Sequence, residues 1–147
     1  MSLISLALNV IWILFGGIEM ALGWVVAALI MAVTIVGLPW ARAALTLALY
    51  SLAPFGRTVV RWDVIEGRET LGTGPLGTIG NIIWLVLAGW WLALGHLATA
   101  VALAISIIGI PFAWGHLKLA RLALWPIGMT IVTNDMDSTN PMRYRFR

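Results

Sequence analysis

Few side chains in this sequence could take part in chemistry, and several of them follow a Gly-X-Pro tripeptide. His116, Lys118 and Arg121 lie in the apolar stretch FAWGHLKLARLALWPIG, directly after Gly109 and Pro111. Lys118 and Arg121 are three positions apart and would share one face of a helix. Such a face could line the mouth of an anion pathway or contact lipid phosphate. The long basic side chains could equally just reach the aqueous interface.

The same tripeptide occurs earlier, at Gly37 and Pro39 in the segment TIVGLPW, and Arg42 follows it. A proline removes one helical hydrogen bond, and the neighbouring glycine adds backbone freedom. In lipid, the freed backbone groups need partners inside the protein or in a hydrated cavity. We therefore expect each tripeptide to break a helix, either as a packing kink or as an opening toward a polar path.

Glu19 is the only acidic residue within an apolar stretch, and such an acid could couple transport to protons. Its expected position near the outer interface equally allows simple contact with water. His96 and His116 fall near opposite ends of one predicted span, which favours interfacial positions over metal binding. The sequence contains no cysteine, phosphate-binding loop or metal-spaced histidine pair. We therefore expect no catalytic residue, metal or cofactor, and no enzyme activity.

The composition predicts an integral membrane protein. Hydrophobic residues make up 61% of the 147 residues and charged residues 10%, whereas soluble domains contain about 25% charged residues. The nearly uncharged stretches 2–56 and 75–132 are each long enough for more than one crossing. The net charge of +3 comes from scattered residues and does not suggest nucleic-acid binding. The opening segment MSLISLALNVIW lacks a basic start, so we expect a retained first helix.

The chain contains an internal duplication. Residues 9–60 align without a gap on residues 81–132, with 21 identities in 52 positions. The identities include polar, aromatic and helix-breaking residues, which apolar composition alone would not align. Those matched pairs are Asn9 and Asn81, Trp12 and Trp84, Gly17 and Gly89, Gly23 and Gly95, Gly37 and Gly109, Pro39 and Pro111, Pro54 and Pro126, and Gly56 and Gly128.

Each copy is predicted to form a hairpin of two transmembrane helices, which gives an all-α membrane protein with four spans. The second helix of each copy is expected to be broken at its Gly-X-Pro tripeptide. The expected spans are 3–22, 25–45, 76–94 and 97–117. The expected units are a first repeat (1–60), a cytoplasmic loop (61–75), a second repeat (76–132) and a cytoplasmic tail (133–147).

The predicted spans also give an expected position for each of five tryptophans. The predicted turns at Gly23–Trp24 and at Gly95–His96 would place Trp24, Trp90 and Trp91 near the outer interface, where amphipathic rings are favoured. Trp12 and Trp84 do not fit such a belt, so we expect them to pack between helices.

The arginines favour a multi-pass topology with both termini in the cytoplasm. The loop RTVVRWDVIEGRETLGTGP and the tail NPMRYRFR each hold three arginines. Positively charged segments tend to stay on the cytoplasmic side, and an even number of crossings between loop and tail satisfies this tendency. A rival topology has one long span per copy followed by an interfacial helix. It would put loop and tail on opposite sides and invert the second copy.

These residues support a family resemblance. The second copy, NIIWLVLAGWWLALGHLATAVALAISIIGIPFAWGHLKLARLALWPIG, resembles the inner-membrane component domain of the bacterial YccF-like family. The first copy, NVIWILFGGIEMALGWVVAALIMAVTIVGLPWARAALTLALYSLAPFG, is similar to it more loosely. The resemblance implies paired two-span units in the bacterial inner (plasma) membrane. It implies no activity and carries over no catalytic residue.

Three functions stay open from the sequence. The leading expectation is a channel-like homo-oligomer, because four helices leave little room for a passage within one subunit. Arg42, His116, Lys118 and Arg121 would give it a weak preference for anions. The alternative is a non-conducting scaffold or accessory subunit that binds anionic lipid or another membrane protein. The third is a small proton-coupled transporter that depends on Glu19.

Overall fold

The computed structural model describes residues 2–133. Met1 and residues 134–147 lie outside the described part, so nearly all of the expected tail, with its three arginines, lies outside it too.

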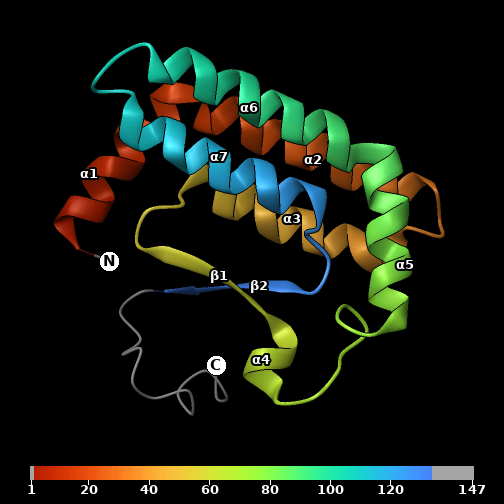
Figure 1. The fold of residues 1–147 in the computed structure, drawn as a ribbon. Coiled ribbons are helices and arrows are strands. Elements are labelled where there is room, and N and C mark those ends of the chain that lie inside the picture. Colours follow the sequence, from red (N-terminus) through yellow and green to blue (C-terminus); the bar gives the residue numbers. More distant parts are fainter. Residues whose placement is uncertain (1, 134–147) are drawn as a thin grey trace.

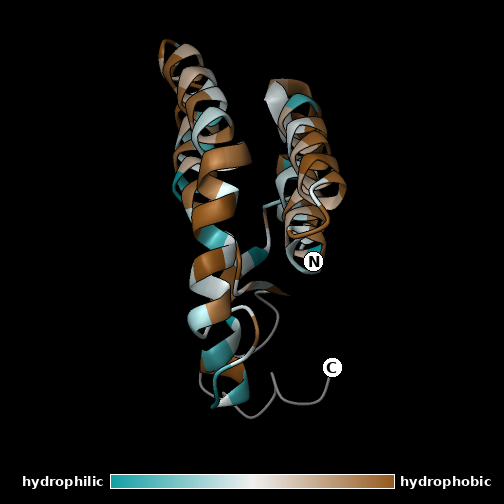
Figure 2. Ribbon diagram, turned by 90° about the vertical axis from the view of Figure 1, so that its right-hand side faces the viewer, coloured by the Kyte–Doolittle hydropathy of each residue, from teal (hydrophilic) through white to brown (hydrophobic). Residues whose placement is uncertain are grey.

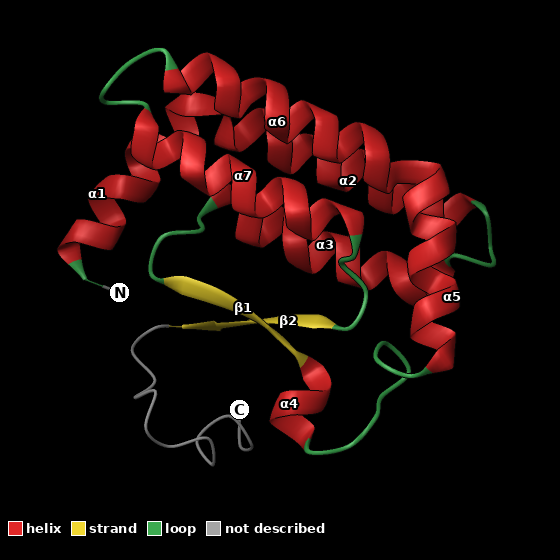
Figure 3. Cartoon of the chain, in the orientation of Figure 1, coloured by secondary structure: helices red, strands yellow, loops and turns green. Residues whose placement is uncertain are grey.

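Each copy forms a bent helix, a tight turn, a second helix and a short strand (Figures 1 and 3). The first copy consists of α1 (Leu3–Trp12), the π-helical turn η1 (Ile13–Gly17), α2 (Ile18–Val33), α3 (Leu38–Leu52) and β1 (Arg57–Arg61). The second consists of α5 (Pro75–Trp84), the π-helical turn η2 (Leu85–Gly89), α6 (Trp90–Ala104), α7 (Ile110–Leu124) and β2 (Met129–Thr133). Between the copies lies the short helix α4 (Trp62–Glu66). The protein is mostly helical, as predicted, with one small sheet in addition.

The Gly-X-Pro tripeptides form the turns of the two hairpins, which corrects the prediction that they break a span. Helix α2 continues through the predicted turn at Gly23–Trp24, and α6 continues through Gly95–His96. Both prolines occupy the first turn of the following helix, α3 or α7. A proline is favourable there because the first N–H groups of a helix have no partner within it.

The glycine of each tripeptide is required by a close approach of two backbone segments. A Cβ at Gly109 would lie 2.1 Å from the carbonyl oxygen of Leu103, and a Cβ at Gly37 would lie 2.6 Å from that of Met31. Each turn therefore folds back tightly onto the end of the preceding helix, and a larger residue would force the two apart.

The first helix of each copy is bent at its π-helical turn. Phe15 and Gly16 leave helical geometry, with φ −98° and ψ 38° at Phe15 and φ 99° at Gly16. Positive φ is accessible to glycine without the steric cost that a Cβ adds. Figure 1 shows α1 and α5 turning away from the other long helices at these bends. The remaining α2, α3, α6 and α7 pack as two antiparallel hairpins, which we call the helical bundle.

The duplicated asparagines tie the first helix of each copy to the segment after the second helix. The Asn9 amide donates to the carbonyl oxygen of Phe55 (3.0 Å) and accepts from the Phe55 N–H (2.9 Å). Asn81 makes the same pair of bonds with Ile127, both at 3.0 Å. Phe55 and Ile127 each follow the duplicated proline of their own copy. The same pair of hydrogen bonds therefore recurs in both copies at matching positions.

The duplicated tryptophans close the end of each second helix. The indole N–H of Trp12 donates to the carbonyl oxygen of Ser51, and that of Trp84 to Ala123, both at 2.7 Å. These carbonyl groups lie in the last turn of α3 and α7, where no helical N–H is available. Both indole rings are fully buried, which confirms that they pack between helices.

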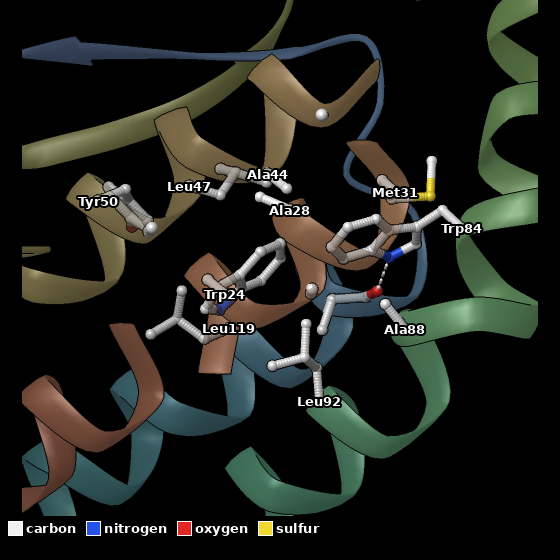
Figure 4. Close-up of a cluster of buried hydrophobic side chains, with 14 of the residues drawn as sticks. Trp24, Ala28, Met31, Ala44, Leu47, Tyr50, Trp84, Ala88, Leu92 and Leu119 are labelled. Atoms are coloured by element: carbon white, nitrogen blue, oxygen red, sulfur yellow. Dashed lines mark hydrogen bonds between the residues drawn. The ribbon is translucent and has the colours of Figure 1, made fainter. Parts of the chain in front are cut away.

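The core fills the space between the hairpins with aromatic and small side chains. Figure 4 shows Trp24, Trp84, Leu92 and Leu119 converging there, with the Trp84–Ala123 hydrogen bond dashed. Trp24 stacks on Trp84 with ring centroids 5.5 Å apart and is fully buried, which corrects its expected interfacial position. It is buried because α2 has no turn at that point. Trp90, by contrast, is 54% exposed.

The strands join the two copies. β1 and β2 pair in an antiparallel register from Arg57 opposite Thr133 to Arg61 opposite Met129. The segments after α3 and after α7 therefore lie on the same side of the molecule, as expected for two hairpins. The rival topology, which would separate them across the membrane, does not agree with this pairing.

Two contacts locate a pseudo-twofold axis between the copies. Val59 pairs with Ile131, and the Trp24 indole donates to His96 at 3.1 Å. In each contact the partners are exact counterparts, 72 positions apart in the duplication. A residue meets its own counterpart only close to the axis that relates the copies. The axis therefore passes through the helical bundle and on through the sheet.

We expect Gly109→Ala to lower the free energy of unfolding by about 1–3 kcal/mol, because the added methyl group meets a backbone carbonyl that cannot rotate away. Gly95→Ala is the matched control in the preceding helix, since its nearest neighbour is the flexible end of Met20 at 3.6 Å. SDS titration of the protein in mixed micelles, followed by circular dichroism, measures both. Equal stability of the two variants would contradict the tight turn.

Asn81→Ala should destabilise the protein by about 1–3 kcal/mol for each of the two backbone groups of Ile127 that it leaves unpaired. Asn9→Ala should also destabilise the protein, through the matching contact in the first copy. The loss of stability should be smaller than in Asn81→Ala, because Asn81 makes one further hydrogen bond, to the Gly77 carbonyl oxygen. The same SDS titration ranks the two variants. An unchanged midpoint for both would show that the clamps are dispensable.

Candidate functional site

The cationic residues predicted from the sequence do not gather around one opening. Arg42, Lys118 and Arg121 are exposed, Arg42 on α3 and the other two on α7. The Lys118 ammonium group lies 5.9 Å from the centre of the Trp114 ring. Glu19 is exposed in the first turn of α2 and makes no ion pair within the described residues.

His116 and His96 are fully buried and lie against each other, which corrects their expected interfacial positions. Their Nδ1 atoms are 3.1 Å apart. His116 also stacks on the Trp12 ring with centroids 4.3 Å apart. The contact arises because α6 and α7 run antiparallel from a turn that lies between the two histidines in the sequence. His116 is therefore not available to anions or lipid headgroups.

The hydrogen bonds around this pair determine one tautomer for each ring. The Trp24 indole can only donate, so Nε2 of His96 accepts (3.1 Å) and its proton is on Nδ1. The Phe15 carbonyl can only accept, so Nε2 of His116 donates to it (3.2 Å). Nδ1 of His96 then donates to Nδ1 of His116. Every ring nitrogen is satisfied with both rings neutral.

This chain of hydrogen bonds is a structural element of the core. It ends at an indole N–H on one side and at a backbone carbonyl on the other, and neither group passes a proton on. The Phe15 carbonyl is available because the helix bends at Phe15 and Gly16. Sequence reasoning missed the pair, although the alignment of Trp24 with His96 offered a signal once an axis between the copies was considered.

A pocket of about 880 Å³ lies between the helical bundle and the polar side of the molecule. It is bounded by the start of α3, by α4 and the loop after it, by the start of α5, and by β2. Its polar side chains include Arg42, Thr46, Glu66, Arg68 and Thr70, and its apolar ones include Trp40, Trp62, Leu71, Leu76 and Ile127.

The pocket combines positive charge with an apolar wall. Arg42 makes no ion pair within the described residues, whereas Arg68 lies 3.7 Å from the Glu66 carboxylate. The side chain of Arg68 is 77% exposed, so this pair leaves most of the guanidinium free. One unbalanced positive charge therefore remains in the pocket. Its chemistry suits an anion that carries an apolar group.

A neighbouring charged pair lies at the start of α4. Arg61 donates from Nε and Nη2 to the two carboxylate oxygens of Asp63, at 3.0 and 2.5 Å. These hydrogen bonds lower the pKa of Asp63 below its usual range. Asp63 is therefore a carboxylate at neutral pH and keeps Arg61 occupied, so Arg61 adds little free positive charge at this end of the sheet.

Of the pocket residues, the sequence singled out only Arg42. Arg68, Trp62 and Trp40 were missed because they lie on three different elements. The pairing of β1 with β2 brings these elements together. A pairing between segments so far apart in the sequence cannot be predicted from a local pattern. Arg68 had appeared only as one of several arginines in a loop.

Comparison with known proteins identifies the family. Residues 7–57 and 79–129 both match the sequence profile described as "Inner membrane component domain". The chain belongs to the YccF family. The two YccF matches have the same offset as the duplication, since 79 − 7 and 129 − 57 both give 72. The family and the apolar helices together place the protein in the bacterial inner membrane.

Named YccF relatives match most of the chain. "Inner membrane protein YccF" of Escherichia coli (strain K12) is 41% identical over 129 residues, which is 86% of each chain. "Inner membrane protein YccF" of Shigella flexneri gives the same values. No solved structure matches the chain.

The Trp24–His96 bond can be measured with a double-mutant cycle. His96→Leu should strand the Trp24 indole and destabilise the protein by about 1–3 kcal/mol beyond its loss of packing. Trp24→Phe keeps an aromatic ring and removes the donor. In the double variant both partners are gone, so its loss should be smaller than the sum of the single losses. Additive losses in SDS titration would show that the two side chains do not interact.

Proposed function

We propose that the protein binds anionic phospholipid in the inner membrane through the Arg42–Arg68 pocket and acts there as a non-conducting membrane component. The observation that carries the proposal is the pocket itself, which joins two guanidinium groups to an apolar wall beside the helical bundle. A phospholipid has this same combination of an anionic group and hydrocarbon.

Each part of the lipid has a matching part of the pocket. Guanidinium groups bind phosphate oxygens with two parallel N–H donors, so Arg42 and Arg68 suit the phosphate. The hydroxyl groups of Thr46 and Thr70 suit the polar headgroup, and Leu76 and Trp40 suit the first carbons of the acyl chains. Tryptophan is favoured at this level of a membrane because its ring is apolar and its N–H is polar.

The charge balance predicts which lipid binds. Glu66 offsets part of the charge of Arg68, and Arg42 has no acidic partner among the described residues. A zwitterionic lipid would bring its own positive group into a pocket that is already positive. A lipid with net negative charge, such as phosphatidylglycerol, adds no such repulsion and is the expected ligand.

A conducting role would have to use more than one copy of the chain. The space between the two hairpins is occupied by fully buried side chains, among them Trp12, Trp24, Trp84, Met31 and Leu92. A channel-like homo-oligomer with a preference for anions would therefore conduct along an interface between copies, where Lys118 and Arg121 are exposed. A proton-coupled transporter would need a polar path at Glu19, which lies on the outward side of α2.

Lipid binding can be measured by native mass spectrometry of delipidated protein with phosphatidylglycerol or phosphatidylcholine. We expect preferential binding of phosphatidylglycerol, and a loss of about tenfold or more in Arg42→Ala and Arg68→Ala, since a hydrogen bond to a charged group contributes about 1.5–3 kcal/mol. Lys118→Ala is the matched control, because it removes one positive charge outside the pocket.

Two results would overturn the lipid proposal. Equal binding of both lipids, or an equal loss in Lys118→Ala, would show that the pocket does not select the ligand. Planar-bilayer recordings under asymmetric chloride should be silent. Unitary currents that change in Arg121→Ala would favour the channel-like oligomer instead.

A further inference from the structure

We infer that both helical hairpins enter the bilayer from one side and return to it, with the turns 34–38 and 105–110 immersed in hydrocarbon. In this arrangement the pseudo-twofold axis lies along the membrane normal, and the sheet with α4 lies at the cytoplasmic surface. Helices α2, α3, α6 and α7 then run obliquely within the membrane and do not cross it.

The helices of the bundle are too short to cross a membrane. Helix α2 has 16 residues and α3, α6 and α7 have 15 each. At about 1.5 Å per residue each is about 22–24 Å long, whereas the hydrocarbon core is about 30 Å thick. The continuous helices Leu3–Val33 and Pro75–Ala104 are long enough to cross. They are bent at η1 and η2, so neither offers its full length in one direction.

The hairpin turns have the composition of a surface that contacts lipid. The side chains of Ile35 and Val36 are 78% and 63% exposed, and those of Ile107 and Ile108 are 87% and 74% exposed. Neither turn contains a charged residue. Turns at an aqueous surface favour glycine, asparagine, aspartate and serine. Here Ile35 even adopts φ 60°, a conformation in which a β-branched side chain is strained.

The first turn also pairs its own backbone N–H groups. The N–H groups of residues 34, 35, 36 and 38 donate to carbonyl oxygens within the hairpin. The N–H of Gly37 donates to the hydroxyl of Thr34 (3.0 Å), and that hydroxyl donates to the Met31 carbonyl oxygen (2.7 Å). Pro39 has no N–H. Every backbone N–H from Thr34 to Leu38 is therefore paired, which removes the donor part of the cost of placing irregular backbone in hydrocarbon.

The second turn repeats the serine–glycine part of this arrangement. The N–H of Gly109 donates to the Ser106 hydroxyl (3.0 Å), which lies 3.4 Å from the carbonyl oxygen of Leu103. Thr34 and Ser106 are counterparts in the duplication. Both copies therefore pair the glycine N–H with a side-chain hydroxyl. In the second turn the N–H groups of Ile107 and Ile108 have no partner among the described residues, so this turn carries a backbone cost that the first turn does not.

The position of the sheet decides the direction of the membrane normal. Figure 1 shows the two turns at opposite ends of the bundle and the sheet alongside it. If the bundle helices crossed the bilayer, the turns would lie on opposite sides and the sheet would lie at mid-depth. Arg57 and Arg61 on β1 and Asp63 on α4 would then be in hydrocarbon, where charges are costly. With the normal along the axis, all three lie at one surface.

The distribution of polar residues agrees with this direction. Figure 2 shows hydrophobic colouring along the helices, with hydrophilic segments most frequent toward the end where α4 lies. The outward row of α2 consists of Leu22, Val26, Leu29 and Val33, all at least 49% exposed. Glu19 is the one charged residue of α2 and α6, and it stands in the first turn of α2, where the helix dipole favours an anion.

Single cysteines test the inference, because the natural sequence contains none. The full-length variants Ile35→Cys, Ile107→Cys and Glu66→Cys are treated with a membrane-impermeant maleimide in spheroplasts and in inverted inner-membrane vesicles. Glu66→Cys should react only in inverted vesicles. The two turn variants should react in neither and should react fully after SDS is added. The folded protein itself does not shield these positions, since both side chains are largely exposed.

Other labelling patterns would overturn the inference. Reaction of both turns in spheroplasts would show that both turns reach the outer aqueous surface and are not immersed in hydrocarbon. Reaction of one turn from each side would show inverted copies with the axis in the membrane plane. A nitroxide attached at Ile35→Cys should be relaxed by oxygen and not by a water-soluble nickel chelate. Nickel relaxation, or relaxation by neither agent, would mean that water or another protein copy covers the turn.

Discussion

Every buried backbone group in this protein has to find its partner within the chain, because the surrounding lipid offers none. The duplicated polar residues supply those partners. An asparagine amide holds both backbone groups of the residue after a proline, and an indole N–H takes a carbonyl at the end of the second helix. The same bonds occur in the other copy. The 72-residue repeat is thus a repeat of hydrogen-bond partners as much as of hydrophobic helices.

The pseudo-twofold axis explains why a sequence difference between the copies, at the point where they meet, allows a hydrogen bond. Two identical residues that face each other across a twofold axis present the same groups. Two indoles would each offer an N–H donor, and neither could accept. After the duplication the counterparts are Trp24 and His96, a donor and an acceptor, and they bond directly. His116 extends the chain to Phe15 and has only Ala44 as its counterpart. A fused pair can have this asymmetry, whereas a symmetric dimer of one repeat cannot.

The membrane class, the duplication, the family and the burial of Trp12 and Trp84 could all be derived from the sequence, because each depends on composition or local pattern. The turns were misplaced because they expose isoleucine and valine and carry no charge, whereas Gly23 beside Trp24 resembled an interfacial turn. The histidine pair depends on a helix bend at Phe15 and Gly16 that composition does not reveal. The pocket depends on strand pairing between segments that are distant in the sequence. Of its lining residues, only Arg42 was singled out from the sequence.

That strand pairing also constrains how the protein is made. β1 emerges from the ribosome with the first copy, but its only partner in the sheet is the strand that ends the second copy. Until synthesis is almost complete, the first copy must hold its place in the membrane with an open strand edge, which can pair with other chains. A chain that stops between the copies would keep this edge permanently, so premature termination would leave a species prone to pair with other chains.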